Sequence, residues 1–255
     1  MTSTSAYGEN LARRIITGAG AVSLVPYRVD SLMSVEVLAH GVDDRGRFLV
    51  ICSTADAELM GATEVRVDGV KKALEFDVDI TVASLHALAT VRWLDVADGA
   101  EVLGVTVRPH LSVGVLDPES ILVHGPDGVT KTAPETLLGA GPTSRELSTR
   151  ELDARDEIAR LSDNQLSTLL SNALVGMGPG VLLSENDHAG CGPTDDKLWV
   201  VDVDHSGVVL LKLVDARLTT VLVTFPEPVD TIADLARAVD ALAAYTSVRH
   251  ASPRI

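Results

Sequence analysis

Cysteine is scarce in this sequence, since Cys52 and Cys191 are the only two among 255 residues. Two thiols cannot build the disulfide framework that stabilises small secreted domains. The opening residues, MTSTSAYGENLARR, lack the apolar core of a signal peptide. No uninterrupted apolar run reaches the roughly 18 to 20 residues that span a bilayer. These absences predict a cytoplasmic protein with reduced thiols.

Basic residues are also few. The chain has 21 lysines and arginines against 36 aspartates and glutamates, which gives a formal net charge of −15. Such a charge repels nucleic-acid phosphates and anionic lipid headgroups. We therefore expect neither nucleic acid nor a membrane surface as a partner. At 255 residues the chain can form one large domain or two small ones.

The first half of the chain contains a series of short strand patterns. An amphipathic helix is expected at residues 7–17, and β-type runs then recur to about residue 125. The runs 34–42 and 47–54 flank a turn at 43–46 and predict a hairpin. Residues 73–80 (ALEFDVDI) alternate between apolar and acidic, which predicts a strand with one solvated acidic face. Together these patterns indicate an antiparallel barrel or sandwich.

The second half changes character near residue 128, where Gly, Pro, Ser and Thr mark an irregular connection. A helical pattern at 149–174 follows, then a Gly-rich loop at 176–196, three strand patterns and a final helix. We expect a small α+β domain built as helix, three-stranded antiparallel sheet and helix. The predicted domains are 1–140 and 141–255.

The last strand pattern runs into Phe225-Pro-Glu-Pro and then a helix. Proline lacks the N–H that a sheet requires, so Pro226 and Pro228 end the strand. Thr231 and Asp234 have the spacing of a capping box, which predicts the start of the helix. The corner therefore has a structural role.

The same corner carries a family resemblance. The runs DVDHSGVVL (202–210), VLVTFPEPVD (221–230) and LARAVDAL (235–242) resemble the C-terminal (DUF2470-like) domain of heme-utilisation (HugZ-type) proteins. In that family the domain follows an FMN-binding-like split β-barrel related to pyridoxamine 5′-phosphate oxidase. The resemblance implies an α+β fold of this kind, a homodimer and heme binding, in some members with heme degradation and release of iron.

The sequence departs from the family at the helix that opens the C-terminal domain. Many members carry two histidines there, and the second supplies the iron ligand in some. The matching stretch here, 160–167, has neither, and Gln165 stands at the second position. An amide is a poor heme ligand compared with imidazole. That mode of ligation is therefore not expected in this chain.

Other relatives ligate iron through a histidine in the C-terminal tail. His250 lies at a similar place here, with Arg249 and Arg254 beside it. By this resemblance His250 would ligate the iron and the arginines would pair with the heme propionates. The alternative is a frayed terminus with a solvated histidine.

Flavin binding is a further possibility that the barrel raises. Related oxidases hold the FMN phosphate with basic side chains on barrel strands, and this half has few such residues, among them Arg47, Arg66, Lys71 and Lys72. No pattern among them would enclose a phosphate, so FMN is not expected.

The remaining candidate residues give weaker signals. His188 and Cys191 have the chemistry of zinc ligands but lack a second pair. His40 and His86 lie in apolar sequence, where a histidine usually meets a local hydrogen-bond partner. Glu75, Asp77 and Asp79 would form a solvated face or a docking surface for a basic partner.

The leading hypothesis is thus a heme-binding protein that traffics, stores or degrades heme. The alternatives are a cofactor-less barrel dimer that binds other proteins and, further off, an FMN-dependent oxidoreductase. Whether the chain is an enzyme stays open at this point, as do any catalytic residues.

Overall fold

The computed structural model describes residues 4–75, 78–139, 145–187, 197–214 and 216–250, and the side chains at 4–6, 145 and 248–250 lie outside this description. The chain forms two compact units. Residues 1–71 and 83–143 make the first, and residues 72–82 and 144–255 make the second. The fold is mixed α+β, as predicted from the sequence. Within the described residues, no helix has the length and hydropathy to cross a bilayer.

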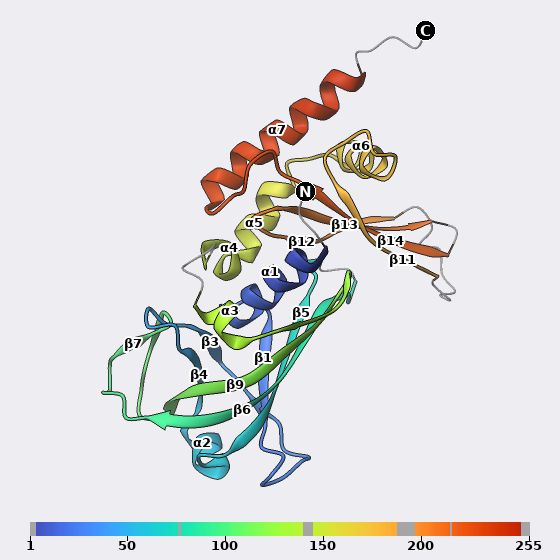
Figure 1. Cartoon of the computed structure of the whole chain (residues 1–255). Coiled ribbons are helices and arrows are strands. Elements are labelled where there is room, and N and C mark those ends of the chain that lie inside the picture. The colour runs from blue at the N-terminus through green and yellow to red at the C-terminus, as the bar shows by residue number, and fades with distance from the viewer. Residues whose placement is uncertain (1–3, 76–77, 140–144, 188–196, 215, 251–255) are drawn as a thin grey trace. The chain divides into compact units, whose positions relative to one another are not determined.

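The first unit is an antiparallel sheet that curls into a half-barrel (Figure 1). Its strand order is β2-β1-β5-β6-β9-β4-β3, and β10 pairs with β9. Helix α1 packs against β9, β10 and α3. The elements are α1 (Thr4–Ile16), β1 (Ala21–Val25), β2 (Val35–Glu36), β3 (Ala39–Val42), β4 (Phe48–Ser53), α2 (Thr54–Met60), β5 (Glu64–Lys72), β6 (Thr81–Leu94), β7 (Glu101–Val102), β8 (Val105–Thr106), β9 (Leu111–Gly125), β10 (Gly128–Thr132) and α3 (Pro134–Leu138).

The hairpin predicted around residues 43–46 is confirmed. Strands β3 and β4 pair in antiparallel register, with Val42 opposite Phe48. The Asp43 carboxylate accepts hydrogen bonds from the backbone N–H of Arg45 and of Arg47 and also pairs with the Arg47 side chain. One short acidic side chain therefore closes the turn.

The prediction of a strand at residues 73–80 is wrong. Strand β5 ends at Lys72 and β6 begins at Thr81, and the described residues between them are not in a strand. This connection belongs to the second unit. Glu75 does not face solvent there, because its carboxylate accepts from the backbone N–H of Val200 at 3.2 Å and pairs with Arg155 at 3.4 Å. Its position is set by these partners and not by alternation.

The second unit packs helices on one face of an antiparallel sheet. The sheet has four strands in the order β11-β14-β13-β12, and α5, α6 and α7 pack together over it. The elements are α4 (Arg145–Thr149), α5 (Glu151–Ile158), α6 (Asp163–Leu174), β11 (Val181–Asp187), β12 (Leu198–Val203), β13 (Gly207–Val214), β14 (Arg217–Thr224) and α7 (Ile232–His250). The core between helices and sheet includes Ile158, Leu161, Leu169, Leu170, Val208, Leu210, Val221, Val223, Leu235, Val239 and Leu242.

Two details of this unit differ from the sequence prediction. Residues 181–187, expected in a Gly-rich loop, form the edge strand β11 paired with β14. The helix expected at 149–174 is divided, because Ser162 caps a new helix, α6. The spacing alone does not reveal this break, because Ile158, Leu161 and Leu166 stand at i, i+3 and i+8, which is also the pattern of one continuous helix.

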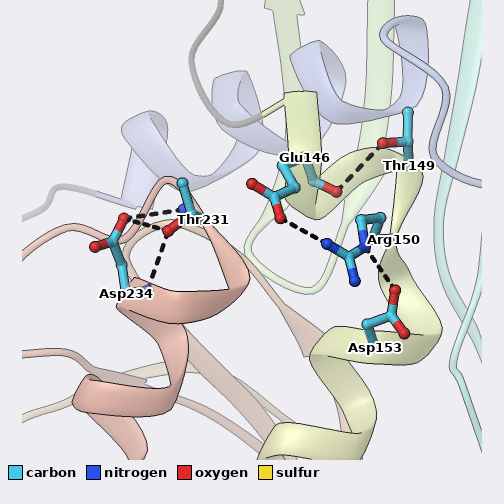
Figure 2. Close-up of polar contacts among 6 residues, drawn as sticks. All are labelled: Glu146, Thr149, Arg150, Asp153, Thr231 and Asp234. Carbon is cyan, nitrogen blue, oxygen red and sulfur yellow. Dashed lines mark hydrogen bonds and ion pairs between the residues drawn. The ribbon is translucent and has the colours of Figure 1, made fainter.

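The corner after β14 is confirmed as a structural feature. Strand β14 ends at Thr224. The Thr231 hydroxyl accepts from the N–H of Asp234 at 3.1 Å, and the Asp234 carboxylate accepts from the N–H of Thr231 at 3.1 Å, a complete capping box (Figure 2). Figure 2 also shows Arg150 between Glu146 and Asp153, at 2.9 and 2.7 Å, which links α4 to the start of α5.

The turn between β12 and β13 is built by one buried carboxylate. Oδ1 of Asp204 accepts from the Ser206 backbone N–H at 2.7 Å, from the Ser206 hydroxyl at 2.6 Å and from the Gly207 N–H at 3.0 Å. A Cβ at Gly207 would lie 2.2 Å from the carbonyl oxygen of Val223, so only glycine fits. The Asp-His-Ser-Gly signature therefore has a folding role.

Candidate ligand-binding site

Strand β6 turns His86 outward from the half-barrel. Along this strand Leu85 and Ala87 are buried, whereas His86 and Leu88 are exposed. Side chains of successive strand residues point to opposite faces, so the two exposed residues share the outer face. The sequence grouped His86 with His40 as a histidine in apolar surroundings. Strand alternation instead gives it a side chain that is 46% exposed.

His86 is held by a carboxylate on the neighbouring strand. Its Nδ1 lies 2.8 Å from Oδ1 of Asp68 on β5. Arg66 binds the same carboxylate through Nη2 at 2.7 Å and through Nε. Partial burial raises the pKa of Asp68, but the hydrogen bonds from Arg66 and His86 lower it by more. The pKa of Asp68 is therefore below its ordinary value. Asp68 is therefore ionised at neutral pH.

The proton on the His86 ring follows from this contact. An ionised carboxylate only accepts hydrogen bonds, so Nδ1 must carry the hydrogen. In the neutral imidazole the lone pair is then on Nε2, the atom directed away from Asp68. A histidine oriented by a carboxylate in this way is the usual arrangement of a metal-ligating imidazole. The Nε2 atom of His86 is accordingly available to bind a metal ion.

Several neighbours on the outer face are apolar. Leu122 lies directly opposite His86 on β9 and is 37% exposed. Leu88 and Val129 are 48% and 63% exposed. His124 meets His86 edge to face, with ring centroids 5.7 Å apart. The outer face of β5, β6, β9 and β10 thus combines two imidazoles with exposed aliphatic side chains.

The other histidine predicted to have a local partner does have one. Nε2 of His40 lies 2.7 Å from the carbonyl oxygen of Ile15. Burial lowers the pKa of His40, and its hydrogen bonds to the Ile15 and Ala19 backbone offset only part of that effect. His40 is a structural residue in the first unit.

The second unit contains a cavity of about 590 Å³. It is lined by parts of α5, α6, β12 and β13 and by Glu75, and its charges are mixed. The lining residues are Glu75, Arg155, Ile158, Ala159, Leu161, Asp163, Asn164, Leu166, Ser167, Lys197, Leu198, Trp199, Val200 and Lys212. Among these described lining residues there is no His, Cys, Met or Tyr. The described wall of the cavity therefore offers no side chain of the kind that ligates heme iron.

Gln165, the position that the resemblance singled out, lies on α6 between two residues that line this cavity, Asn164 and Leu166, and its side chain has another role. Oε1 of Gln165 accepts from the backbone N–H of Ser162 at 2.9 Å and from its hydroxyl at 3.0 Å. The Ser162 hydroxyl accepts in return from the Gln165 N–H. The amide at this position is part of a helix cap.

The residues proposed at the C-terminus are placed only in part. Arg249 and His250 belong to the last turn of α7 and not to a free tail, and their side chains lie outside the description. Arg254, like His188 and Cys191 of the suggested zinc site, lies outside the described residues altogether. In the described part of the chain, no group of three or more His, Cys, Asp or Glu is arranged to hold a metal ion.

Three of the basic residues considered for an FMN phosphate are paired with carboxylates. Arg47 binds Asp43 at 2.7 Å and Lys72 binds Asp79 at 2.5 Å, in addition to the Arg66 pair described above. Lys71, the fourth, is fully buried. These contacts give each of the three exposed cations a role within the fold.

No family model matches the sequence, and no curated protein matches it either. Solved structures do resemble it. A heme binding protein from Mycobacterium smegmatis is 16% identical, with 97% of this chain and 99% of that chain covered and a TM-score of 0.51. At this identity the likeness concerns the fold alone. A protein of unknown function from Agrobacterium tumefaciens str. C58 is 14% identical over 94% of this chain and 98% of that chain, with a TM-score of 0.38, which supports no inference.

Proposed function

We propose that this protein binds heme. The observation that carries the proposal is the fold that it shares, over nearly its whole length, with a heme binding protein. Heme requires apolar contact for its macrocycle and a side chain that ligates its iron. The outer face of the first unit has exposed aliphatic residues and a histidine whose Nε2 is directed away from its carboxylate partner.

The direct test is a titration of the purified protein with hemin, followed at the Soret band. We expect a stoichiometric shift of the band that saturates at one heme per chain. A band that merely broadens in proportion to added hemin, with no saturation, would contradict the proposal. Absorbance of the protein as purified near 450 nm would point to flavin instead.

The C-terminal residues remain part of the proposal. His250 would ligate the iron, and Arg249 and Arg254 would pair with the propionates. The variant His250→Ala is expected to change the Soret position of the hemin complex. An unchanged spectrum would remove His250 from the site without affecting the proposal that the protein binds heme.

We further propose that the protein handles heme in the cytoplasm as a homodimer, in trafficking, storage or degradation. Light scattering during gel filtration measures the molar mass of the protein in solution and so tests the homodimer. Incubation of the hemin complex with ascorbate in air separates degradation from storage and trafficking. Loss of the Soret band with release of chelatable iron indicates degradation, and a stable band indicates storage or trafficking.

Gln165 supports one alternative, a barrel protein without cofactor that binds other proteins. At the position where relatives ligate iron, this chain has an amide engaged in a helix cap. If hemin produces no saturable shift under any condition, this alternative becomes the better explanation of the fold.

A further inference from the structure

We infer that His86 ligates the iron of the bound heme and that Asp68 is its positioning residue. This inference rests on the proposed function and names the place on the chain where that function would occur. The observation behind it is the juxtaposition of an exposed imidazole, a carboxylate 2.8 Å from its Nδ1 and an exposed aliphatic surface on one face of the half-barrel.

The ligand chemistry follows from the hydrogen bond between His86 and Asp68. With its hydrogen on Nδ1, the neutral ring offers Nε2 as the metal-binding atom and is fixed in orientation. Arg66 holds both oxygens of Asp68, with its Nε 2.9 Å and its Nη2 2.7 Å from Oδ2 and its Nε 3.0 Å from Oδ1. The ligand therefore has a fixed partner, and the partner has a fixed support.

The surface around His86 suits the macrocycle. Leu122 is directly opposite His86 across the β6–β9 pair. Leu88 is two residues further along β6, on the same face, and Val129 pairs with His124 on the next strand. These three aliphatic side chains are all more than a third exposed. Covering them with a flat apolar ligand removes their surface from water, which favours binding by about 25 cal/mol for each Å² covered.

The edge of this face carries a cation suited to a propionate. Lys131 on β10 lies directly opposite Leu122, so the two side chains share the outer face, and Lys131 is exposed. Neighbouring strands are about 4.8 Å apart, which places β10 two strand spacings, roughly 10 Å, from β6. An ammonium at that position can pair with a carboxylate at the rim of a ligand whose centre lies over His86.

The chain also provides a matched control. His124 is a second histidine on the same face, in ring contact with His86, but the Asp68 hydrogen bond goes to His86. Replacing either histidine by alanine removes an exposed imidazole from the same surface. Only the loss of His86 is expected to change the iron coordination.

The experiment compares hemin titrations, Soret spectra and electron paramagnetic resonance of the ferric complexes of His86→Ala, Asp68→Asn, His124→Ala and the unmutated protein. Circular dichroism checks that each variant is folded. We expect His86→Ala to change the Soret band and the paramagnetic resonance signal of the ferric complex, and added imidazole to restore both. We expect Asp68→Asn to keep the ligand but to bind heme about 10-fold to 100-fold more weakly. Asp79→Asn, which alters an exposed aspartate outside this face, is expected to change nothing.

The outcomes separate this inference from the proposed function. If the unmutated protein shows no saturable shift, heme binding itself is refuted, and the assignment of His86 with it. If the shift is present and is unaltered in His86→Ala, the protein binds heme and His86 is not the ligand. A change in His124→Ala equal to that in His86→Ala would also overturn the assignment, because it would show that the surface and not the oriented ring is responsible.

Discussion

Replacing Gln165 by alanine is expected to lower the stability of the second unit and to leave heme binding unchanged. In the structure Oε1 of Gln165 accepts two hydrogen bonds from Ser162, at 2.9 and 3.0 Å, and completes a capping box. Both residues are at the protein surface, so the loss falls at the lower end of the range for caps, about 0.5 to 1 kcal/mol. For a unit of roughly 100 residues that corresponds to a fall of about 2 to 6 °C in melting temperature.

The matched variant is Gln165→Glu. Glutamate keeps the side-chain oxygen that accepts from Ser162, and its charge is favourable in the first turn of a helix. We therefore expect Gln165→Glu to be as stable as the unmutated protein, and Ser162→Ala with Gln165→Ala to cost less than the sum of the single changes. Urea denaturation followed by circular dichroism measures all three. If the alanine variant is fully stable, Gln165 does not contribute as a cap. If its hemin spectrum changes, Gln165 takes part in heme binding.

Three further predictions follow from groups elsewhere in the fold. Burial, with a smaller contribution from a nearby aspartate, raises the pKa of the Cys52 thiol to about 11, so in Cys191→Ser protein Ellman's reagent should titrate Cys52 only after denaturation; a rapid native reaction would refute this. Gly207→Ala places a Cβ 2.2 Å from the carbonyl oxygen of Val223 and should cost about 1 to 3 kcal/mol in urea denaturation; an unchanged midpoint would contradict the close approach. The pKa of His40 is lowered by burial from its ordinary value of 6.5, so the unfolded chain binds its proton more readily. Its contribution to stability should be complete above about pH 6.5 and fall as the pH drops below it, and His40→Gln should show a shallower decline over the same range.

Local patterns predicted the parts of the fold that local interactions determine. The hairpin at 43–46 depends on Asp43 and the arginines next to it. The capping box of α7 depends on Thr231 and Asp234, three residues apart. In both cases the interacting groups are within four residues of one another, so their spacing in the sequence is sufficient to identify them.

The failures involve partners that are distant in the sequence. Residues 73–80 have a strand-like alternation, but Glu75 finds Val200 and Arg155, 125 and 80 residues away. Strand β11 was missed because its residues, VLLSEND, have no clear alternation and are flanked by glycines. As an edge strand it is mostly exposed, so no buried stripe is imposed on its sequence. Pairing with β14 supplies its order.

The candidate site on the half-barrel shows the same limit. His86 and Asp68 are 18 residues apart on different strands, and His124 is 38 positions beyond His86. Only the register of β5, β6 and β9 brings them onto one face. The resemblance directed attention to position 165 and to the C-terminus, whereas a strand reading of 81–94 with its alternation would have turned His86 outward.

The crossing of residues 72–82 into the second unit has a consequence for how this polypeptide can be divided. A fragment that begins at residue 144 contains every helix and strand of the second unit but lacks Glu75. The N–H of Val200, on the terminal strand β12 of its sheet, would lose its acceptor, and Arg155 would lose a carboxylate partner. The second unit therefore cannot be transferred intact to another protein by a single cut at residue 144. The transferred sheet would lack Glu75, the side chain that covers part of its edge strand β12.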